Sequence, residues 1–150
     1  MERSDTPLKP EVKEELETCV KAGSEMLGLD LAAASPDDIQ ECVFQKIGTV
    51  RESSDLPEHE RQELGLLLGC LWGQTVCDRL GWQWAQIDFA EGGEFYGIVT
   101  PDRSHAILPL HYIDGLLKDR EKDHTSLLLY NMLVAGKLPP AEAGEYSVLG

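Results

Sequence analysis

The sequence predicts an α+β fold in which a long central helix packs on a three-stranded antiparallel β-meander, with further helices before and after. Three changes of pattern lead to this prediction: apolar residues follow helical spacing up to residue 80, alternate as in strands after Gly81, and return to helical spacing after residue 112. A chain of 150 residues with a hydrophobic share of 42% has the size and composition of one domain. We therefore expect residues 1–150 to form a single domain, with residues 1–9 and 141–150 as peripheral tails.

Two helices are predicted before the central one. Over residues 10–27, Val12, Leu16 and Val20 lie on one face, which is typical of a surface helix with one buried stripe. Ser35 and Pro36 then supply an N-cap and a proline at the first helical position of a second helix. Residues 49–56 are polar and acidic, and we expect a loop there.

The central helix is predicted over residues 57–80, with Gly81 as its C-terminal cap. Gly65, Gly69 and Gly73 recur every fourth residue and therefore share one face. Glycine inside a helix costs about 1 kcal/mol relative to alanine, so three in register indicate that another backbone approaches closely. We favour packing against this chain's own sheet or helices, and a homodimer seam is the alternative.

Strands are predicted over residues 82–89, 95–100 and 105–110, separated by the turn signals of residues 91–94 and 101–104. Pro109 is expected to end the third strand, because proline cannot donate to a β-ladder. Helices are expected over residues 112–119 and 125–135.

The charge balance excludes some classes of partner. With 27 acidic against 13 basic residues the net charge is −14, which disfavours binding to nucleic acid and to anionic membrane surfaces. The excess indicates either solubility alone or a surface that attracts a basic protein partner. The four cysteines have no metal-binding spacing and no apolar leader precedes the domain, so we expect free thiols and a cytoplasmic location.

Residues 64–69 (Leu-Gly-Leu-Leu-Leu-Gly), the stretch Leu80-Gly-Trp-Gln-Trp84 and the corner Pro109-Leu-His-Tyr-Ile113 form one arrangement. It resembles a class of small acidic bacterial domains of unknown function, in which a Leu-Gly-x3-Gly helix leads into a Gly-Trp strand, a hairpin and a strand ended by proline. The resemblance covers the middle third to half of the chain and brings no catalytic signature. It implies an immunity or regulatory role directed at other proteins.

No motif for catalysis, nucleotide binding or metal binding is present, so we expect no cofactor and no metal. An enzyme that pairs His111 with a thiol such as Cys77, or with a carboxylate, is the least favoured hypothesis. His59 and His124 lie in polar segments and are expected to be solvated.

Two groups of residues are candidates for binding a ligand or partner. Aromatic and neighbouring side chains gather where the central helix meets the meander, either as core or as an open binding face: Trp82, Trp84, Tyr96, His111 and Tyr112. Acids gather around the hairpin turn: Asp88, Glu91 and Glu94. The first hypothesis for function is a non-catalytic acidic protein that binds a basic partner, and the second is a small-molecule sensor that uses the aromatic face.

Overall fold

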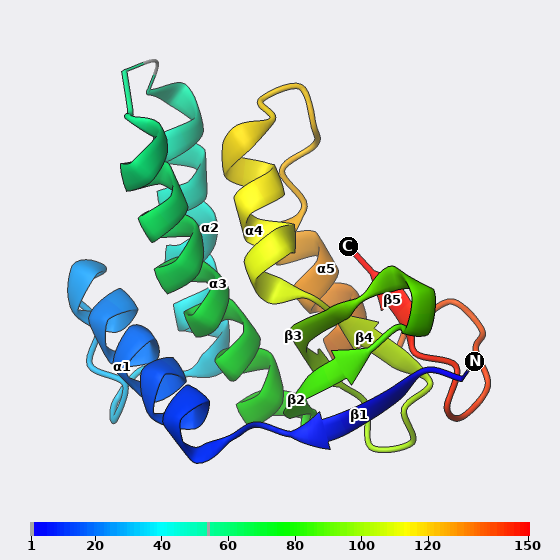
Figure 1. Ribbon diagram of the computed structural model, residues 1–150. Coiled ribbons are helices and arrows are strands. Elements are labelled where there is room, and N and C mark those ends of the chain that lie inside the picture. The colour runs from blue at the N-terminus through cyan, green and yellow to red at the C-terminus, as the bar shows by residue number, and fades with distance from the viewer. Residues whose placement is uncertain (1, 54) are drawn as a thin grey trace.

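The computed structural model describes residues 2–53 and 55–150 and confirms the α+β class (Figure 1). The elements in chain order are β1 (Ser4–Pro7), α1 (Pro10–Met26), α2 (Pro36–Glu52), α3 (Glu58–Leu80), β2 (Gln83–Asp88), a 3-10 turn (Ala90–Gly92), β3 (Glu94–Val99), β4 (His105–Ile107), α4 (Pro109–Lys118), α5 (Ser126–Val134) and β5 (Ser147–Leu149). Within the described residues, five α-helices accompany one five-stranded mixed sheet.

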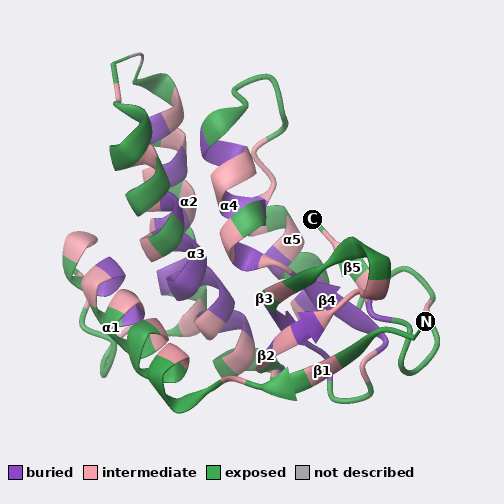
Figure 2. Cartoon of the chain, in the orientation of Figure 1, coloured by how far each residue is buried: buried purple, intermediate pink, exposed green. Residues whose placement is uncertain are grey.

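α3 is the central helix of the bundle. It packs against α1, α2, α4 and α5, and its C-terminal end reaches β2 (Figure 1). Because neighbours surround it, every residue from Leu68 to Gly73 is buried, whereas α1 keeps a green, exposed outer face in Figure 2. The continuous helix over residues 58–80 confirms the prediction that its glycines do not break it.

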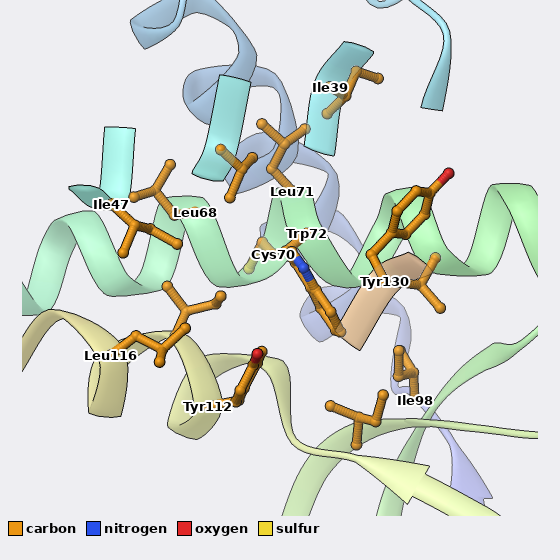
Figure 3. Close-up of a cluster of buried hydrophobic side chains, with 14 of the residues drawn as sticks. Ile39, Ile47, Leu68, Cys70, Leu71, Trp72, Ile98, Tyr112, Leu116 and Tyr130 are labelled. Carbon is orange, nitrogen blue, oxygen red and sulfur yellow. The ribbon is translucent and has the colours of Figure 1, made fainter. Parts of the chain in front are cut away.

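The main core forms around α3. Trp72 is fully buried, and its indole N–H donates to the Ser126 carbonyl at 3.2 Å. Figure 3 shows this ring among side chains from α2, α4, α5 and β3, and the centre of the Tyr112 ring lies 5.3 Å from its own. This core is assembled from the five α-helices together with β3 and β4.

The glycine face of α3 is covered from within the chain. A Cβ atom on Gly73 would lie 2.6 Å from the Trp84 ring and 2.8 Å from Pro109, and one on Gly69 would lie 3.0 Å from the Pro109 carbonyl oxygen. Gly65 faces α4 in the same way. The glycines therefore let the start of α4 and the Trp84 ring approach the α3 backbone, as the internal-packing prediction states, and the face is closed to a second copy of the chain.

The sheet differs from the predicted three-stranded meander. β2, β3 and β4 do pair antiparallel in sequence order, but the full order is β1-β2-β3-β4-β5. Residues 4–7 pair antiparallel with β2, and residues 147–149 pair parallel with β4. The terminal segments predicted as peripheral tails therefore contain the two edge strands, which at four and three residues are too short to show strand alternation.

A second, smaller core lies on the sheet face that points away from α3. It combines the side chains of Ile87, Val99 and Ala106 with Tyr146 from the segment before β5. The sheet is thus covered on both faces, by the helices on one and by the C-terminal segment on the other.

Several predicted boundaries need correction. α2 continues to Glu52 and buries Val50, so residues 49–52 belong to a helix and not to the predicted loop. β4 ends at Ile107 because Pro109 is already the first residue of α4, which begins three residues before the expected helix. Trp82 precedes β2 and is buried in the main core, so it does not extend a strand face shared with Trp84.

Candidate binding cleft

A cleft of about 970 Å³ opens beside the sheet edge formed by β1. Its walls come from β1, α1, the C-terminal half of α3 and β2, which meet at the lower left of the molecule in Figure 1. The apolar part of the lining consists of Pro7, Leu8, Leu16, Val20, Leu31, Cys77, Trp82, Trp84 and Ala85. The charged part consists of Asp5, Lys13, Glu17, Lys21, Asp78 and Arg103. We refer to this site as the α1–β2 cleft.

An ion pair joins two chain segments on one side of the cleft. The Arg103 guanidinium donates to the Asp5 carboxylate at 3.1 and 3.3 Å and to the Gln83 side-chain oxygen at 3.2 Å. Arg103 adopts a φ of 59°, in the left-handed region. The Tyr146 hydroxyl also donates to Asp5. This cluster fixes β1 against the rest of the sheet.

The Asp5 carboxylate is held in its charged form. Burial alone raises the pKa of Asp5, but hydrogen bonds from Arg103 and Tyr146 outweigh burial, and the pKa lies below its usual value of 3.8. Burial, together with the charge of Asp5, raises the pKa of Tyr146 to about 12. At neutral pH the cluster therefore holds one carboxylate, one guanidinium and one protonated phenol.

Trp84 lies in the cleft wall at the end of a hydrogen-bonded chain. Its indole N–H donates to the Gln74 side-chain oxygen at 3.2 Å, and the Gln74 amide donates to Asp78 at 2.8 Å. Both partners belong to α3 and also line the cleft. The chain fixes the orientation of the ring, so the aromatic wall is preorganised.

α1 contributes charges that are not neutralised within the protein. Lys13, Glu17 and Lys21 are spaced by four residues, share one face of α1 and line the cleft. Among the described residues none of the three makes a hydrogen bond or ion pair through its side chain. They are available to a polar ligand.

A second hollow of about 580 Å³ lies near the β2–β3 turn and is lined by Arg3, Phe89, Phe95 and Val148, among others. The Arg3 guanidinium lies 5.2 Å from the centre of the Phe89 ring, a cation–π distance. Phe89 and Phe95 pack on each other with ring centres 6.0 Å apart. Arg3 thus covers part of the aromatic surface, and this hollow offers less space than the α1–β2 cleft.

The aromatic residues selected from the sequence lie at separate places in the structure. Trp82 and Trp84 meet at the α1–β2 cleft. Tyr112 is buried, its hydroxyl bonds to Thr125 at 2.9 Å, and burial raises its pKa to about 12. Tyr96 is exposed on β3, and His111 places its ring edge-on against Phe95 with centres 5.0 Å apart. They do not assemble into one aromatic face.

The acids of the hairpin lie around the β2–β3 turn. Asp88 accepts from the Ala90 N–H at 2.8 Å and holds the turn, and Glu94 accepts from the Gln86 amide at 3.1 Å. Glu91 lines the second hollow. Within the described residues, no three His, Cys, Asp or Glu side chains converge as metal ligands would.

The structure does not favour a Cys77–His111 pair. Burial, with the charge of Asp78, raises the pKa of Cys77 to about 12, so its thiolate is scarce at neutral pH. No hydrogen bond joins Cys77 to His111 in the part of the chain that is described.

The other two histidines that were expected to be solvated differ from each other. His59 is exposed as expected, whereas His124 is half-buried, stacks on Phe44 with ring centres 4.1 Å apart and bonds to the Phe44 carbonyl.

Sequence reasoning missed Asp5, Arg103 and the lysines of α1 as cleft residues. Asp5 and Arg103 are separated by 98 positions, and no periodic pattern links them. The four-residue spacing of Lys13 and Lys21 around Glu17 was visible but is also that of an ordinary solvated helix face.

Comparisons with known proteins identify no relative: neither a protein-family model, nor a curated protein, nor a solved structure matches the chain. Among residues 2–53 and 55–150, none of the helices has the length and apolar character needed to cross a lipid bilayer.

Proposed function

We propose that this protein binds a small molecule in the α1–β2 cleft. The observation that carries the proposal is the combination of the cleft's volume, about 970 Å³, with a mixed lining in which Trp82 and Trp84 lie beside uncommitted charged groups. Ligand sites are typically hollows of about 300–1,000 Å³ with apolar walls and a few placed polar groups. This is the small-molecule hypothesis from the sequence, moved from an open sheet face to a cleft at the sheet edge.

The internal hydrogen bonds of the cleft support this use. Trp84 and Arg103 are both held by side chains of the protein, so binding would not have to order them. Lys13 and Lys21 remain without partners in the described structure and supply charge at the rim. The cleft therefore combines a fixed side, which holds Trp84 and Arg103, with unpaired lysines on α1 that can adapt to a ligand.

A thermal-shift screen of metabolites tests the proposal. A ligand present at about one hundred times its dissociation constant stabilises the native state by about 2.7 kcal/mol. For a chain of 150 residues this corresponds to a rise in Tm of roughly 5–11 °C. Tryptophan fluorescence reports the same event, because Trp82 and Trp84 line the cleft.

Two matched variants of α1 locate the site. Glu17 lines the cleft, whereas Glu15 lies on the same helix, is exposed and does not. Glu17→Phe should fill the cleft and abolish the shift, and Glu15→Phe makes the same chemical change and should leave it intact. A shift that survives in both variants places the ligand elsewhere, and a broad screen with no response in the unmodified protein refutes the proposal.

The acidic surface supports a second candidate function, in which this protein binds a basic partner protein. Many of the acidic residues behind the net charge of −14 are exposed on helices, for example Glu11, Glu14 and Glu15 of α1. An immunity or regulatory role, implied by the resemblance to small acidic bacterial domains, fits this surface. The four cysteines are free, which is compatible with the cytoplasmic location that we propose.

The second candidate is tested by affinity capture on the immobilised protein at low and high salt. Exposed charge pairs are screened by salt, so a genuine basic partner should be released as the salt concentration rises. The variant Glu14→Lys/Glu15→Lys should weaken capture of the same partner. Equal capture by this variant, or no basic protein retained at low salt, would remove the candidate.

A further inference from the structure

α1 and α3 approach each other unusually closely. A Cβ atom on Gly23 of α1 would lie 3.0 Å from the carbonyl oxygen of Leu67 and 3.6 Å from the Cβ atom of Leu71 on α3. Close contact of this kind requires that one helix carry no side chain at the crossing. The two helix backbones are therefore nearer to one another here than ordinary side-chain packing allows.

One turn along α1 from this crossing, two thiols meet. The side chains of Cys19 of α1 and Cys70 of α3 interact, and both belong to the main core around α3. The helices run antiparallel, since Gly23 faces Leu67 while Cys19 faces Cys70. A disulfide needs Cα atoms about 4.4–6.8 Å apart, so between two helices it can form only where they cross closely.

The two thiols differ in access. Cys70 is 4% exposed and lies beside Trp72 in the buried cluster of Figure 3, whereas Cys19 is half-buried at the edge of that cluster. Burial raises the pKa of Cys70 to about 12, which keeps it a thiol and protects it from direct oxidation. Cys19 is the member of the pair that an oxidant dissolved in water reaches first.

We propose that Cys19 and Cys70 are a site of reversible oxidation, at which a two-electron oxidant such as hydrogen peroxide forms an intramolecular disulfide that ties α1 to α3. In the first step the Cys19 sulfur attacks peroxide, the O–O bond breaks, and Cys19 sulfenic acid and water form. In the second step the Cys70 sulfur attacks the Cys19 sulfur, the S–O bond breaks, and the departing hydroxide takes the Cys70 proton as water. Two thiols and one peroxide thus give one disulfide and two waters.

The remaining thiols lack this arrangement. Cys77 lies two helical turns from Cys70 on the same helix, about 10 Å away, which is too far for a disulfide. Cys42 lies on α2. The inferred bond holds one wall of the α1–β2 cleft, because α1 carries that wall, but its formation does not depend on what the cleft binds.

The variant Cys42→Ser/Cys77→Ser, which retains only the proposed pair, provides the test. After treatment with peroxide and quenching, its mass should fall by two hydrogen atoms, and iodoacetamide in denaturant should label neither thiol. The protein should remain a monomer on a non-reducing gel, its Tm should rise because the cross-link restricts the unfolded chain, and dithiothreitol should reverse each change. Both thiols still labelled, or a cross-link only between two chains, overturns the proposal.

Two further variants assign the steps. Without its partner, Cys19 should keep its oxygen, so Cys70→Ala should gain the mass of one oxygen atom and react with a 1,3-diketone that traps sulfenic acids. Cys19→Ser should leave Cys70 as a free thiol. Oxidation of Cys70 in Cys19→Ser, or an unchanged Cys19 in a folded Cys70→Ala protein, contradicts the proposed order, and circular dichroism verifies that each variant is folded.

Discussion

Replacing Gly73 with alanine tests whether the glycine face of α3 is required by close packing. The new Cβ atom would lie 2.6 Å from Cζ2 of Trp84 and 2.8 Å from Cγ of Pro109. Both neighbours are rings, so neither can move aside as the end of a flexible side chain would. Overpacking of a core typically costs about 1–3 kcal/mol.

The substitution also stabilises the helix, and this stabilisation must be subtracted from the packing cost. Alanine is favoured over glycine in a helix by about 1 kcal/mol. We therefore expect Gly73→Ala to destabilise the protein by about 0–2 kcal/mol, and a matched control isolates the packing part. Gly48 of α2 is helical, and its Cβ atom would meet nothing closer than His124 at 3.9 Å. Gly48→Ala should accordingly stabilise the protein by about 1 kcal/mol.

Urea unfolding monitored by far-UV circular dichroism measures both variants. The free energies of unfolding should differ by about 1–3 kcal/mol, with Gly48→Ala the more stable, and thermal melts should differ by about 2–4 °C for each kcal/mol. The fluorescence of Gly73→Ala should also change, because Trp84 must shift. A Gly73→Ala protein as stable as Gly48→Ala would show that the close approach is not a constraint, and the account of this helix face would fail.

Three other predictions concern buried polar groups. Asp5→Asn removes a carboxylate whose pKa is lowered by Arg103, so the wild type should have the larger free energy of unfolding at neutral pH. This difference in stability should disappear as pH falls through and below 3.8. A difference that persists in acid would contradict the assigned charge state. Trp72→Phe removes the indole N–H that donates to the Ser126 carbonyl and opens a cavity, and should lower the free energy of unfolding by about 2–4 kcal/mol in urea titrations. A loss below about 1 kcal/mol would contradict this prediction. Gln40→Met should change stability by less than about 1 kcal/mol, because within residues 2–53 and 55–150 the buried Gln40 side-chain oxygen has no partner and its amide donates to the Trp72 carbonyl alone. A large loss in the same titration would show that this one hydrogen bond matters.

The sequence was most informative where structure is encoded locally. Ser35 caps α2 by accepting from the Asp38 N–H at 3.1 Å, and Gly81 ends α3 with a φ of 76°, both as the capping patterns predict. The antiparallel order of β2, β3 and β4 also follows from short connections and turn residues. These features depend on residues within a few positions of one another.

The features that sequence reasoning missed depend on distant partners. β1 is defined by pairing with β2, about eighty positions later, and its four residues carry no alternation of their own. The half-buried position of His124 likewise comes from Phe44 on α2. The α1–β2 cleft combines both kinds of information: Trp82 and Trp84 were selected from the sequence, but the opposite wall was not, because α1 shows only an ordinary amphipathic pattern.

The contacts of the two edge strands determine which parts of the protein can fold first during translation. Arg3 donates to the Tyr146 carbonyl at 2.9 Å, and Asp5 binds both Arg103 and Tyr146. A ribosome releases the N-terminal partner of each contact long before the other, so during translation β1 must wait for its neighbours while the helices, whose contacts are more local, condense first. The sheet of the nascent chain therefore remains incomplete until β5 has been synthesised.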